Sequence, residues 1–362
     1  MMRIVVNDIA ASKGGAMSVL KDFYGYLRDN EKDHEWIFLL SDAHVEETDR
    51  IKVIVCDKVK KSRAERLKFD LLNGKKLIES LRPDVFFSMQ NTLINGLSCK
   101  KVLYVHQPLG FQDVKNFSLL KPSEREYAIY QHIISRLVYS SVKKADRTIV
   151  QTEWMKDAVV RKTKVSKERV IKILPDVADL ETDAREGFED SSHFFYPASD
   201  ILYKNHSLLV SASDILRKRG ITDHKIYLTL TPKQFESRFP GRDHNDLVLL
   251  GQIDRDQVIK NYKEMILVFP SYIETFGYPL MEARVVKGRI LAPDLDYSKE
   301  VLSGYGKAYY FDPFDPVSLA DLMEKSIRGE LKEEPVTDTY PSDTAAAKRN
   351  SWEEVVKELT CW

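Results

Sequence analysis

Two glutamates, Glu274 and Glu282, flank the predicted start of a helix in the second half of the chain. A buried strand is expected to end at Phe269, and Pro279 stands where the first helical residue is expected. A helix N-terminus offers free backbone N–H groups, and each carboxylate can accept two hydroxyl hydrogen bonds. These groups together favour a polyhydroxyl ligand. The alternative is a capping Glu274 and a solvated Glu282.

A lysine in the same half of the chain has a position suited to phosphate. Lys204 follows the predicted strand His193–Tyr196 and begins a helical run. A lysine at this place can put a compact positive charge on a diphosphate. The alternative is a solvated lysine at the start of a helix.

The first half carries weaker candidates. Gly14 and Gly15 lie between the first predicted strand and a helix, and paired glycines let a ligand approach backbone amides closely. Their surroundings fit neither the dinucleotide-binding nor the P-loop pattern, so an ordinary turn is the alternative. His106 ends an apolar strand and can polarise a sugar hydroxyl, unless it is a structural histidine. Asn91, at the end of another strand, is a further acceptor-side candidate.

The segment Glu274–Glu282 resembles the E-x7-E motif of retaining GT-B glycosyltransferases, specifically glycosyltransferase family 4. The preceding Phe-Pro-Ser and the following Ala283 also match. The resemblance is strong in the second half and weak in the first. It continues through the short segments Tyr203–His206, Leu291–Asp294, Lys299–Val301 and Tyr310–Pro313.

The resemblance implies roles for residues of the second half. Glu274, with Thr275 and the amides of Phe276 and Gly277, would hold the transferred sugar. Glu282 would hold the ribose hydroxyls of the nucleotide.

The resemblance also implies that Lys204 contacts the donor phosphates. Similar enzymes carry an arginine five residues before this lysine, where the present chain has Ser199. Ser199 therefore stands in the donor site as a departure from the pattern. Another cation, such as Arg284, is a candidate to compensate for the missing charge.

For the first half, the resemblance places Gly14 and Gly15 near the donor phosphate and the acceptor. It places His106 against the transferred sugar. The groups expected to act in catalysis are therefore His106, Lys204 and Glu274, and Asn91 and His106 are expected on the acceptor side. None of these residues is identifiable as a nucleophile.

A metal ion is not expected. Asp294 and Asp296 form a D-x-D pair, which some glycosyltransferases of another fold use for a divalent cation. Here the pair follows the motif helix, where the family has a loop around the donor. No cofactor is implied, because the nucleotide sugar is a substrate.

Short apolar runs alternate with segments of helical spacing, which predicts parallel sheets covered by helices. In the first half, strands are predicted at Arg3–Asn7, Trp36–Leu40, Lys52–Val55, Asp84–Ser88, Lys101–His106 and Arg147–Gln151. In the second half, they are predicted at His193–Tyr196, Lys225–Leu230, Leu247–Leu250, Met265–Phe269 and Arg289–Ala292. The main predicted helices are Met17–Leu27, Leu67–Leu81, His206–Lys218, Arg255–Tyr262, Tyr278–Val286 and Pro316–Ile327.

This pattern predicts an α/β protein with two doubly wound, Rossmann-like domains that face a central cleft, as in GT-B enzymes. Residues 1–180 would form an acceptor-binding domain, and residues 181–362 a domain for the nucleotide sugar. The acidic segment Asp179–Asp190 is taken as the boundary. The final segment Ser351–Trp362 is expected to be helical and to return to the first domain.

The 362 residues carry no net charge, but the charge is unevenly distributed. Residues 1–180 hold 32 Lys and Arg against 24 Asp and Glu. The basic segment Lys58–Lys68 and the mixed apolar and basic segment Tyr127–Val142 suggest peripheral contact with an anionic membrane. Ordinary core packing and a solvated basic helix are the alternative. Three scattered cysteines and no apparent signal peptide suggest a cytoplasmic protein.

The sequence therefore predicts a metal-independent glycosyltransferase of the hexosyltransferase type. It would act on a saccharide or lipid-linked saccharide acceptor in bacterial surface or capsular polysaccharide synthesis. Retention of the anomeric configuration is implied by the resemblance alone, and no nucleic-acid partner is expected. The alternatives are a non-catalytic two-domain sugar- or nucleotide-binding protein and a two-domain oxidoreductase, against which the missing G-x-G-x-x-G argues.

Overall fold

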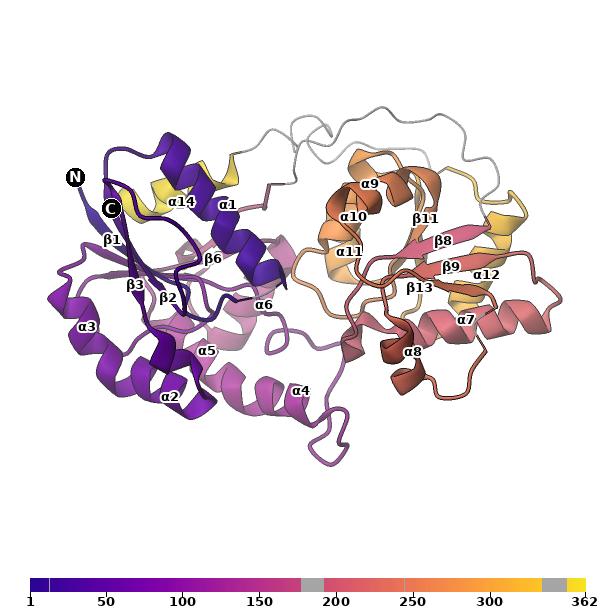
Figure 1. Ribbon diagram of the computed structural model, residues 1–362, viewed down its shortest axis with the longest axis horizontal. Helices are drawn as coiled ribbons and strands as arrows, with labels where there is room; N and C mark the ends of the chain where they lie inside the picture. Colours follow the sequence, from indigo (N-terminus) through magenta and orange to yellow (C-terminus); the bar gives the residue numbers. More distant parts are fainter. Residues whose placement is uncertain (13, 177–191, 244, 334–349) are drawn as a thin grey trace. The chain divides into compact units, whose positions relative to one another are not determined.

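The computed structural model describes residues 1–12, 14–176, 192–243, 245–333 and 350–362 (Figure 1). The chain forms two compact units. Unit 1 comprises Met1–Pro175 and Asn350–Trp362, and unit 2 comprises Asp176–Arg349. The acidic segment Asp179–Asp190, where the domain boundary is predicted, lies outside the described residues.

Unit 1 is built on a seven-stranded parallel sheet with the order β3-β2-β1-β4-β5-β6-β7. Its strands are β1 (Arg3–Asn7), β2 (Glu35–Leu40), β3 (Ile51–Val55), β4 (Val85–Ser88), β5 (Lys100–Tyr104), β6 (Arg147–Val150) and β7 (Val170–Lys172). The strand order reverses between β1 and β4, as in doubly wound folds, where ligands bind at the carboxyl ends of the strands near this point.

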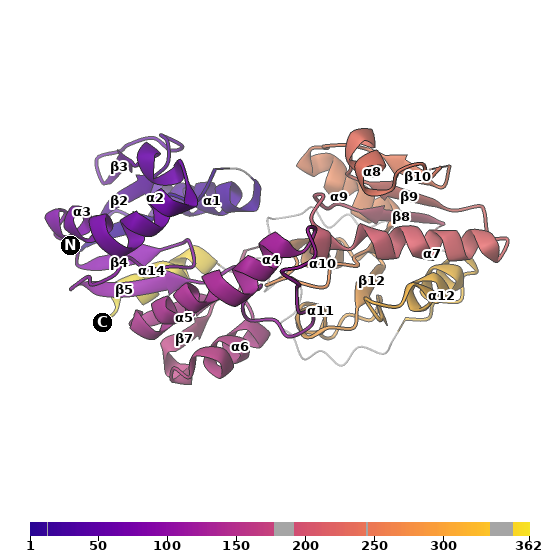
Figure 2. The ribbon, with the colours of Figure 1, turned by 90° about the horizontal axis from the view of Figure 1, so that it is seen from below.

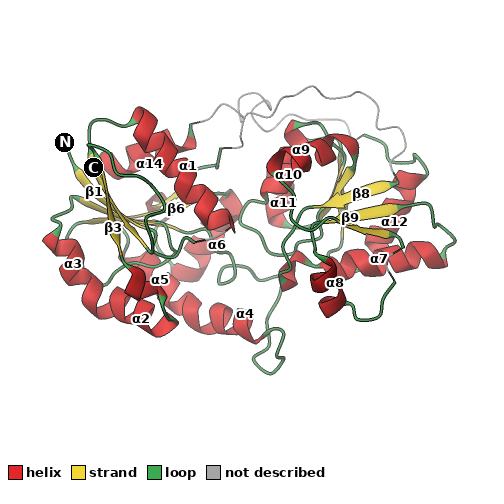
Figure 3. Cartoon of the chain, in the orientation of Figure 1, coloured by secondary structure: helices red, strands yellow, loops and turns green. Residues whose placement is uncertain are grey.

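Helices cover both faces of this sheet (Figures 1 and 3). They are α1 (Gly14–Asn30), α2 (Arg63–Lys68), α3 (Gly74–Ser80), α4 (Arg125–Ile129), α5 (Ser135–Lys144), α6 (Glu153–Thr163) and α14 (Ser351–Thr360). One apolar core joins the sheet to α1 and α14, and a second joins the other face to α3, α5 and α6. Helices α5 and α6 pack side by side (Figure 2).

The C-terminal helix α14 belongs to unit 1. Leu359 is fully buried in the core beneath α1, and the Trp352 ring lies 4.8 Å from that of Phe23. Arg147 of β6 forms an ion pair of 2.9 Å with Glu358. The last helix thus completes the first unit although about half the sequence separates it from that sheet.

Unit 2 has a six-stranded parallel sheet with the order β10-β9-β8-β11-β12-β13. Its strands are β8 (His193–Tyr196), β9 (Lys225–Leu228), β10 (Leu247–Leu249), β11 (Ile266–Val268), β12 (Ile290–Pro293) and β13 (Ala308–Phe311). Its helices are α7 (His206–Lys218), α8 (Pro232–Arg238), α9 (Arg255–Glu264), α10 (Tyr278–Val285), α11 (Asp296–Val301) and α12 (Pro316–Ile327). Both units therefore have the doubly wound, Rossmann-like organisation that the sequence predicts.

Several local predictions are wrong in detail. The single helix expected over Leu67–Leu81 is interrupted by a π-helical turn at Phe69–Asn73. Gly74 permits the turn, because a Cβ there would lie 2.7 Å from the Phe69 carbonyl oxygen. The edge strands β7 and β13 are absent from the prediction, and they are only three and four residues long.

Candidate functional site

The predicted donor residues of unit 2 gather at the carboxyl ends of two neighbouring strands. Strands β8 and β11 pair in parallel, so the segments that follow them emerge side by side. Lys204 lies in a 3-10 turn after β8, and Glu274 lies in the loop after β11. Their side chains form an ion pair, and the Ser271 hydroxyl donates a hydrogen bond of 2.7 Å to the same carboxylate. The fold thus joins two residues that are 70 positions apart.

Hydrogen bonds hold the two loops together beneath this ion pair. The Tyr196 hydroxyl donates to the Lys204 carbonyl at 2.7 Å. Asn205 adopts a left-handed conformation, and its amide donates to the carbonyls of Pro270 at 3.2 Å and Pro313 at 2.8 Å. The ammonium of Lys204 and the Glu274 carboxylate are therefore presented on a rigid base.

Buried tyrosines line the interior side of the Glu274 carboxylate. Burial, followed by the negative charge of Glu274, raises the pKa of Tyr196 and Tyr297 well above the ordinary value. The Tyr297 hydroxyl donates to the Ser271 carbonyl at 2.6 Å. Both tyrosines remain neutral donors at physiological pH, so the base of the site carries no competing charge.

The helix after Glu274 begins at Tyr278, and Pro279 is its second residue rather than its first. Gly277 precedes the helix with a φ of 85°, a conformation that favours glycine. A Cβ at Gly277 would lie 3.3 Å from the Leu280 side chain. The buried Phe276 ring packs 5.3 Å from that of Tyr278, which anchors the loop from Glu274 and Thr275 into the helix. The N-terminus of α10 is consequently held next to Glu274.

Glu282 is buried, which excludes the solvated alternative for this residue. Only 6 % of the residue is exposed. Its carboxylate lies 2.9 Å from Arg255 Nη2 and accepts a 3.2 Å hydrogen bond from the Tyr262 hydroxyl. Burial raises the pKa of Glu282, while the Arg255 charge opposes that rise. Arg255 and Tyr262 lie on α9, and neither is suggested by the motif itself.

The structure corrects the choice of a compensating cation. Arg284 is buried and donates hydrogen bonds of 2.9 Å to the carbonyls of Val301 and Ser303, where it caps the end of α11. Arg238 of α8 is better placed. It pairs at 2.5 Å with Asp200, the neighbour of the exposed Ser199. After burial, the charges of Arg238 and Lys204 both contribute to lowering the pKa of His206, to about 3.

In unit 1, His106 lies two residues beyond the end of β5 rather than within it. It is half-buried, and desolvation lowers its pKa to about 4, so it is neutral at physiological pH. Asn91 lies beside it in a left-handed conformation. The Asn91 side-chain Oδ1 accepts hydrogen bonds from the backbone N–H groups of His106 at 2.8 Å and Gln107 at 3.0 Å. Asn91 therefore shapes the loop that presents His106.

Gly14 and Gly15 lie in the first turn of α1 rather than in a loop before it. A Cβ on Gly15 would meet no atom within 4 Å, so the space beside it is open. Lys13, which precedes the pair, lies outside the described residues. The pair offers a helix N-terminus at the carboxyl end of β1, a place where a helix favours an anion.

The two aspartates of the D-x-D pair have different surroundings. Asp294 forms an ion pair with Lys299, and Asp296 is exposed at the start of α11. In the ranges that the structure describes, no group of three His, Cys, Asp or Glu residues is arranged to hold a metal ion.

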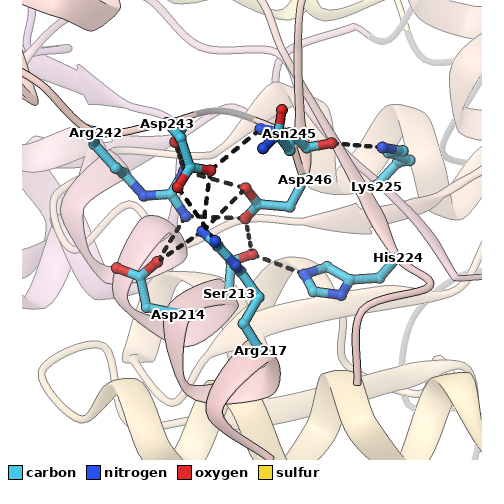
Figure 4. A network of polar contacts seen from close by, with 9 residues as sticks. All are labelled: Ser213, Asp214, Arg217, His224, Lys225, Arg242, Asp243, Asn245 and Asp246. Atoms are coloured by element: carbon cyan, nitrogen blue, oxygen red, sulfur yellow. Dashed lines mark hydrogen bonds and ion pairs between the residues drawn. The ribbon is translucent and has the colours of Figure 1, made fainter. Parts of the chain in front are cut away.

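A second polar cluster in unit 2 has a structural character (Figure 4). The Ser213 hydroxyl bonds to His224 Nε2 at 2.7 Å and also to the Asp246 carboxylate, so the histidine does not bridge serine and aspartate as in a catalytic triad. Arg242 pairs with Asp246 at 2.9 Å. The cluster lies at the amino ends of β9 and β10, opposite the candidate site, and it joins those strands to α7.

Comparison with known proteins bears on the activity of the chain. Residues 180–339 match the family model of glycosyl transferases group 1. This range contains Lys204, Glu274 and Glu282, and the match supports sugar transfer as the activity. No curated protein matches the chain.

Solved structures match nearly the whole chain. Sucrose-phosphate synthase from Thermosynechococcus elongatus is 14 % identical, with a TM-score of 0.64 over 99 % of this chain and 95 % of that one. WaaG, a glycosyltransferase involved in lipopolysaccharide biosynthesis, is 12 % identical, with a TM-score of 0.64 over 99 % and 100 %. HepE from Anabaena, solved with UDP and glucose, is 12 % identical, with a TM-score of 0.58 over 99 % and 95 %. At these identities the likeness establishes the fold.

In the described part of the chain, no helix combines the length and the hydropathy that a membrane span requires.

Proposed function

We propose that the protein is a glycosyltransferase that moves a hexosyl group from a nucleotide-diphosphate sugar to a saccharide or lipid-linked saccharide. The observation that carries the proposal is the Lys204–Glu274 ion pair next to the N-terminus of α10. A cation, a carboxylate and a helix N-terminus meet there, and these groups complement a sugar diphosphate. Synthesis of bacterial surface or capsular polysaccharide is the proposed context, with retention at the anomeric carbon.

In the proposed mechanism, the bond between the anomeric carbon and the diphosphate oxygen breaks, and its electrons leave with the diphosphate. Lys204 and the positive end of the α10 helix dipole stabilise that developing charge. Glu274 holds the sugar hydroxyls, with the loop residues Thr275 and Phe276. The acceptor oxygen then bonds to the anomeric carbon, and its proton passes to the departing diphosphate oxygen.

Glu282 is proposed to hold the ribose hydroxyls. Its pairing with Arg255 and Tyr262 keeps the carboxylate oriented in a buried position. Arg238 is proposed to supply the positive charge that Ser199 lacks. Unit 1 is proposed to bind the acceptor, with Gly14 and Gly15 near the phosphates and His106 against the transferred sugar.

The first test is a thermal-shift screen of the whole protein against UDP, GDP, dTDP and ADP sugars. A ligand that binds only the folded state raises the melting temperature. Turnover of the stabilising nucleotide sugar is then measured as release of the nucleotide. Such turnover distinguishes an enzyme from a non-catalytic binding protein. Stabilisation without turnover in the presence of varied saccharide acceptors would favour the binding protein.

Transfer is predicted to proceed without a divalent metal. Lys204, Arg238 and the α10 amides are fixed groups that can neutralise the leaving diphosphate. Activity in excess EDTA should equal the untreated activity, and Asp294→Asn should behave like the parent protein. Loss of turnover on chelation that Mn²⁺ or Mg²⁺ restores would refute the metal-free mechanism.

A further inference from the structure

Unit 1 contains a second group of polar side chains that the motif does not explain. Asn7, Asp8 and Gln90 are all buried, with exposed fractions of 0 %, 4 % and 6 %. Asn7 ends β1, Asp8 follows it, and Gln90 lies two residues beyond β4. Polar groups of this kind are expensive to bury and are retained where they find partners.

The sheet brings these residues together along the edge formed by the carboxyl ends of its strands. Strands β1 and β4 pair in parallel, with Asn7 opposite Ser88. The Gln90 side chain reaches back to the loop after β1, where its Oε1 accepts the Ala10 N–H at 3.2 Å. His106 follows β5, the next strand along the edge, and Asn91 ties its backbone to the loop after β4. This edge is the switch point of the unit 1 sheet, where doubly wound folds place their ligands.

The cluster contains hydrogen-bond donors and acceptors that have no partner among the described residues. Within the described residues, no partner is found for Asn7 Nδ2 and Oδ1, Gln90 Nε2 or His106 Nδ1. The two amide nitrogens are donors, while the Asn7 oxygen is an acceptor. A ligand that fills this site must therefore offer donors and acceptors together, as a hydroxyl group does.

The charged residues around the cluster argue against both metal ions and anions as its ligand. Burial raises the pKa of Asp8 to about 7, against the opposing charges of Arg66 on α2 and Lys60 in the 3-10 turn Asp57–Lys60. The Lys60 ammonium lies 3.5 Å from the Ala11 carbonyl, in the same loop that Gln90 contacts. The two cations disfavour a metal ion, and the buried carboxylate disfavours an anion. A neutral polyhydroxyl ligand fits both constraints.

We infer that Asn7, Asp8 and Gln90 form a saccharide subsite, in which ionised Asp8 accepts a hydrogen bond from a sugar hydroxyl. The inference rests on the proposed function for its role, since the saccharide bound there would be the acceptor. A carboxylate acceptor forms a stronger hydrogen bond than the neutral acid. Saccharide affinity should therefore rise with pH as Asp8 loses its proton.

The test uses the whole protein with methyl glucoside, methyl galactoside and methyl mannoside as probes. Saturation-transfer NMR titrations at pH 6 and pH 8 measure their affinity. If only the ionised form binds, a carboxyl pKa near 7 gives about tenfold tighter binding at pH 8. Asp8→Asn should abolish that ratio and weaken binding at pH 8 by about fivefold or more.

Matched variants make the outcome decisive. Asp49→Asn removes an exposed carboxylate from the same unit and should leave the affinity and the pH ratio unchanged. Gln90→Leu is a second test should Asp8→Asn fail to fold, and it should weaken binding at both pH values.

Two results would overturn the inference. One is the absence of binding of all three probes to the parent protein. The other is an Asp8→Asn variant with the parent affinity and pH ratio. Either result, with nucleotide-sugar turnover intact, leaves the proposed function standing. A protein that binds no nucleotide sugar instead refutes the proposed function, whatever the saccharide titrations show.

Discussion

At the scale of single residues, the two motif glutamates differ in environment, and this difference predicts different defects. Glu282 is buried against Arg255 and Tyr262, whereas Glu274 pairs with Lys204 and Ser271. Glu282→Ala should weaken binding of the nucleotide sugar by roughly 1.5–3 kcal/mol, because hydrogen bonds to a charged acceptor are lost. Calorimetry measures the change.

Glu274→Ala is the variant to compare with Glu282→Ala, because Glu274 is proposed to contact the sugar rather than the nucleotide. It should impair transfer while free UDP or GDP binds largely as before. Equal loss of free-nucleotide binding in both variants would contradict the division of roles. Unchanged donor affinity in a folded Glu282→Ala protein would remove Glu282 from the site.

Asp8 predicts a stability effect that depends on pH. Its folded pKa of about 7 lies above that of an unfolded aspartate, so the folded state holds the proton more tightly. The resulting stabilisation is complete below about pH 4 and is lost as the pH rises through 7. Asp8→Asn removes the group that titrates, so the variant should not lose this stability as the pH rises. The variant should gain on the order of 4 kcal/mol over the parent at pH 8 relative to pH 4, because each unit of the roughly three-unit rise in pKa is worth about 1.4 kcal/mol.

Urea denaturation at the two pH values measures this difference. Asp49→Asn, which removes an exposed carboxylate from the same unit, serves as the control. An equal effect of Asp8→Asn at pH 4 and pH 8 would show that Asp8 titrates normally. A gain in stability together with a loss of saccharide binding is the pattern expected of a functional residue.

At the scale of elements, the turn into α10 depends on the backbone of Gly277. Both Gly277 and Gly220 have positive φ, of 85° and 79°. Alanine at either position should cost about 1–2 kcal/mol of stability, because a Cβ disfavours this conformation. Gly277→Ala should in addition weaken donor binding by roughly tenfold, since it displaces the amides that precede the helix.

Gly220→Ala is the control for strain alone. It follows α7, and a Cβ there meets no atom within 4 Å. Thermal unfolding measures the shared loss of stability, and calorimetry with the nucleotide sugar measures the specific one. Equal donor affinity in the two variants would show that the turn serves only the fold.

At the scale of the whole molecule, unit 1 is predicted to associate with anionic membranes. Leu71 and Leu72 are 47 % and 70 % exposed in the π-helical turn that directly follows the basic segment Lys58–Lys68. Leu120 and Ile133 are 89 % and 56 % exposed. Burial raises the pKa of Tyr130, and the charge of Arg66 opposes that rise, so the basic segment lies near the π-helical turn Tyr130–Ile134 that contains Ile133. Exposed aliphatic side chains beside basic residues suit an anionic bilayer surface.

Binding to vesicles of anionic lipid should fall as salt is added, since surface attraction is screened within roughly 10 Å at 0.1 M. Leu72→Ser should reduce vesicle binding severalfold, because apolar surface that inserts into the lipid is lost. Phe314→Ser, which removes an exposed aromatic ring from unit 2, is the control. Equal affinity for neutral and anionic vesicles would contradict the prediction.

The sequence by itself determined most of the strands, several of the helices and the places where chemistry is expected. Continuous apolar runs predict buried parallel strands, and β8, α7 and α12 occur at the predicted bounds. The loop from Glu274 to Gly277 and the position of Lys204 after β8 follow from local spacing. Such features depend on residues that are near one another in the chain, and a periodic pattern records them directly.

Only the tertiary structure decided which of these groups meet. The pairing of β8 with β11 joins Lys204 to Glu274, and α9 supplies Arg255 and Tyr262 to Glu282. The sequence suggested Arg284 as a phosphate ligand, but in the structure its side chain donates to carbonyls at the end of α11. The burial that shifts Asp8 arises from strands and turns far apart in the chain. Ionisation and hydrogen-bond partners depend on such non-local contacts, which no local pattern contains.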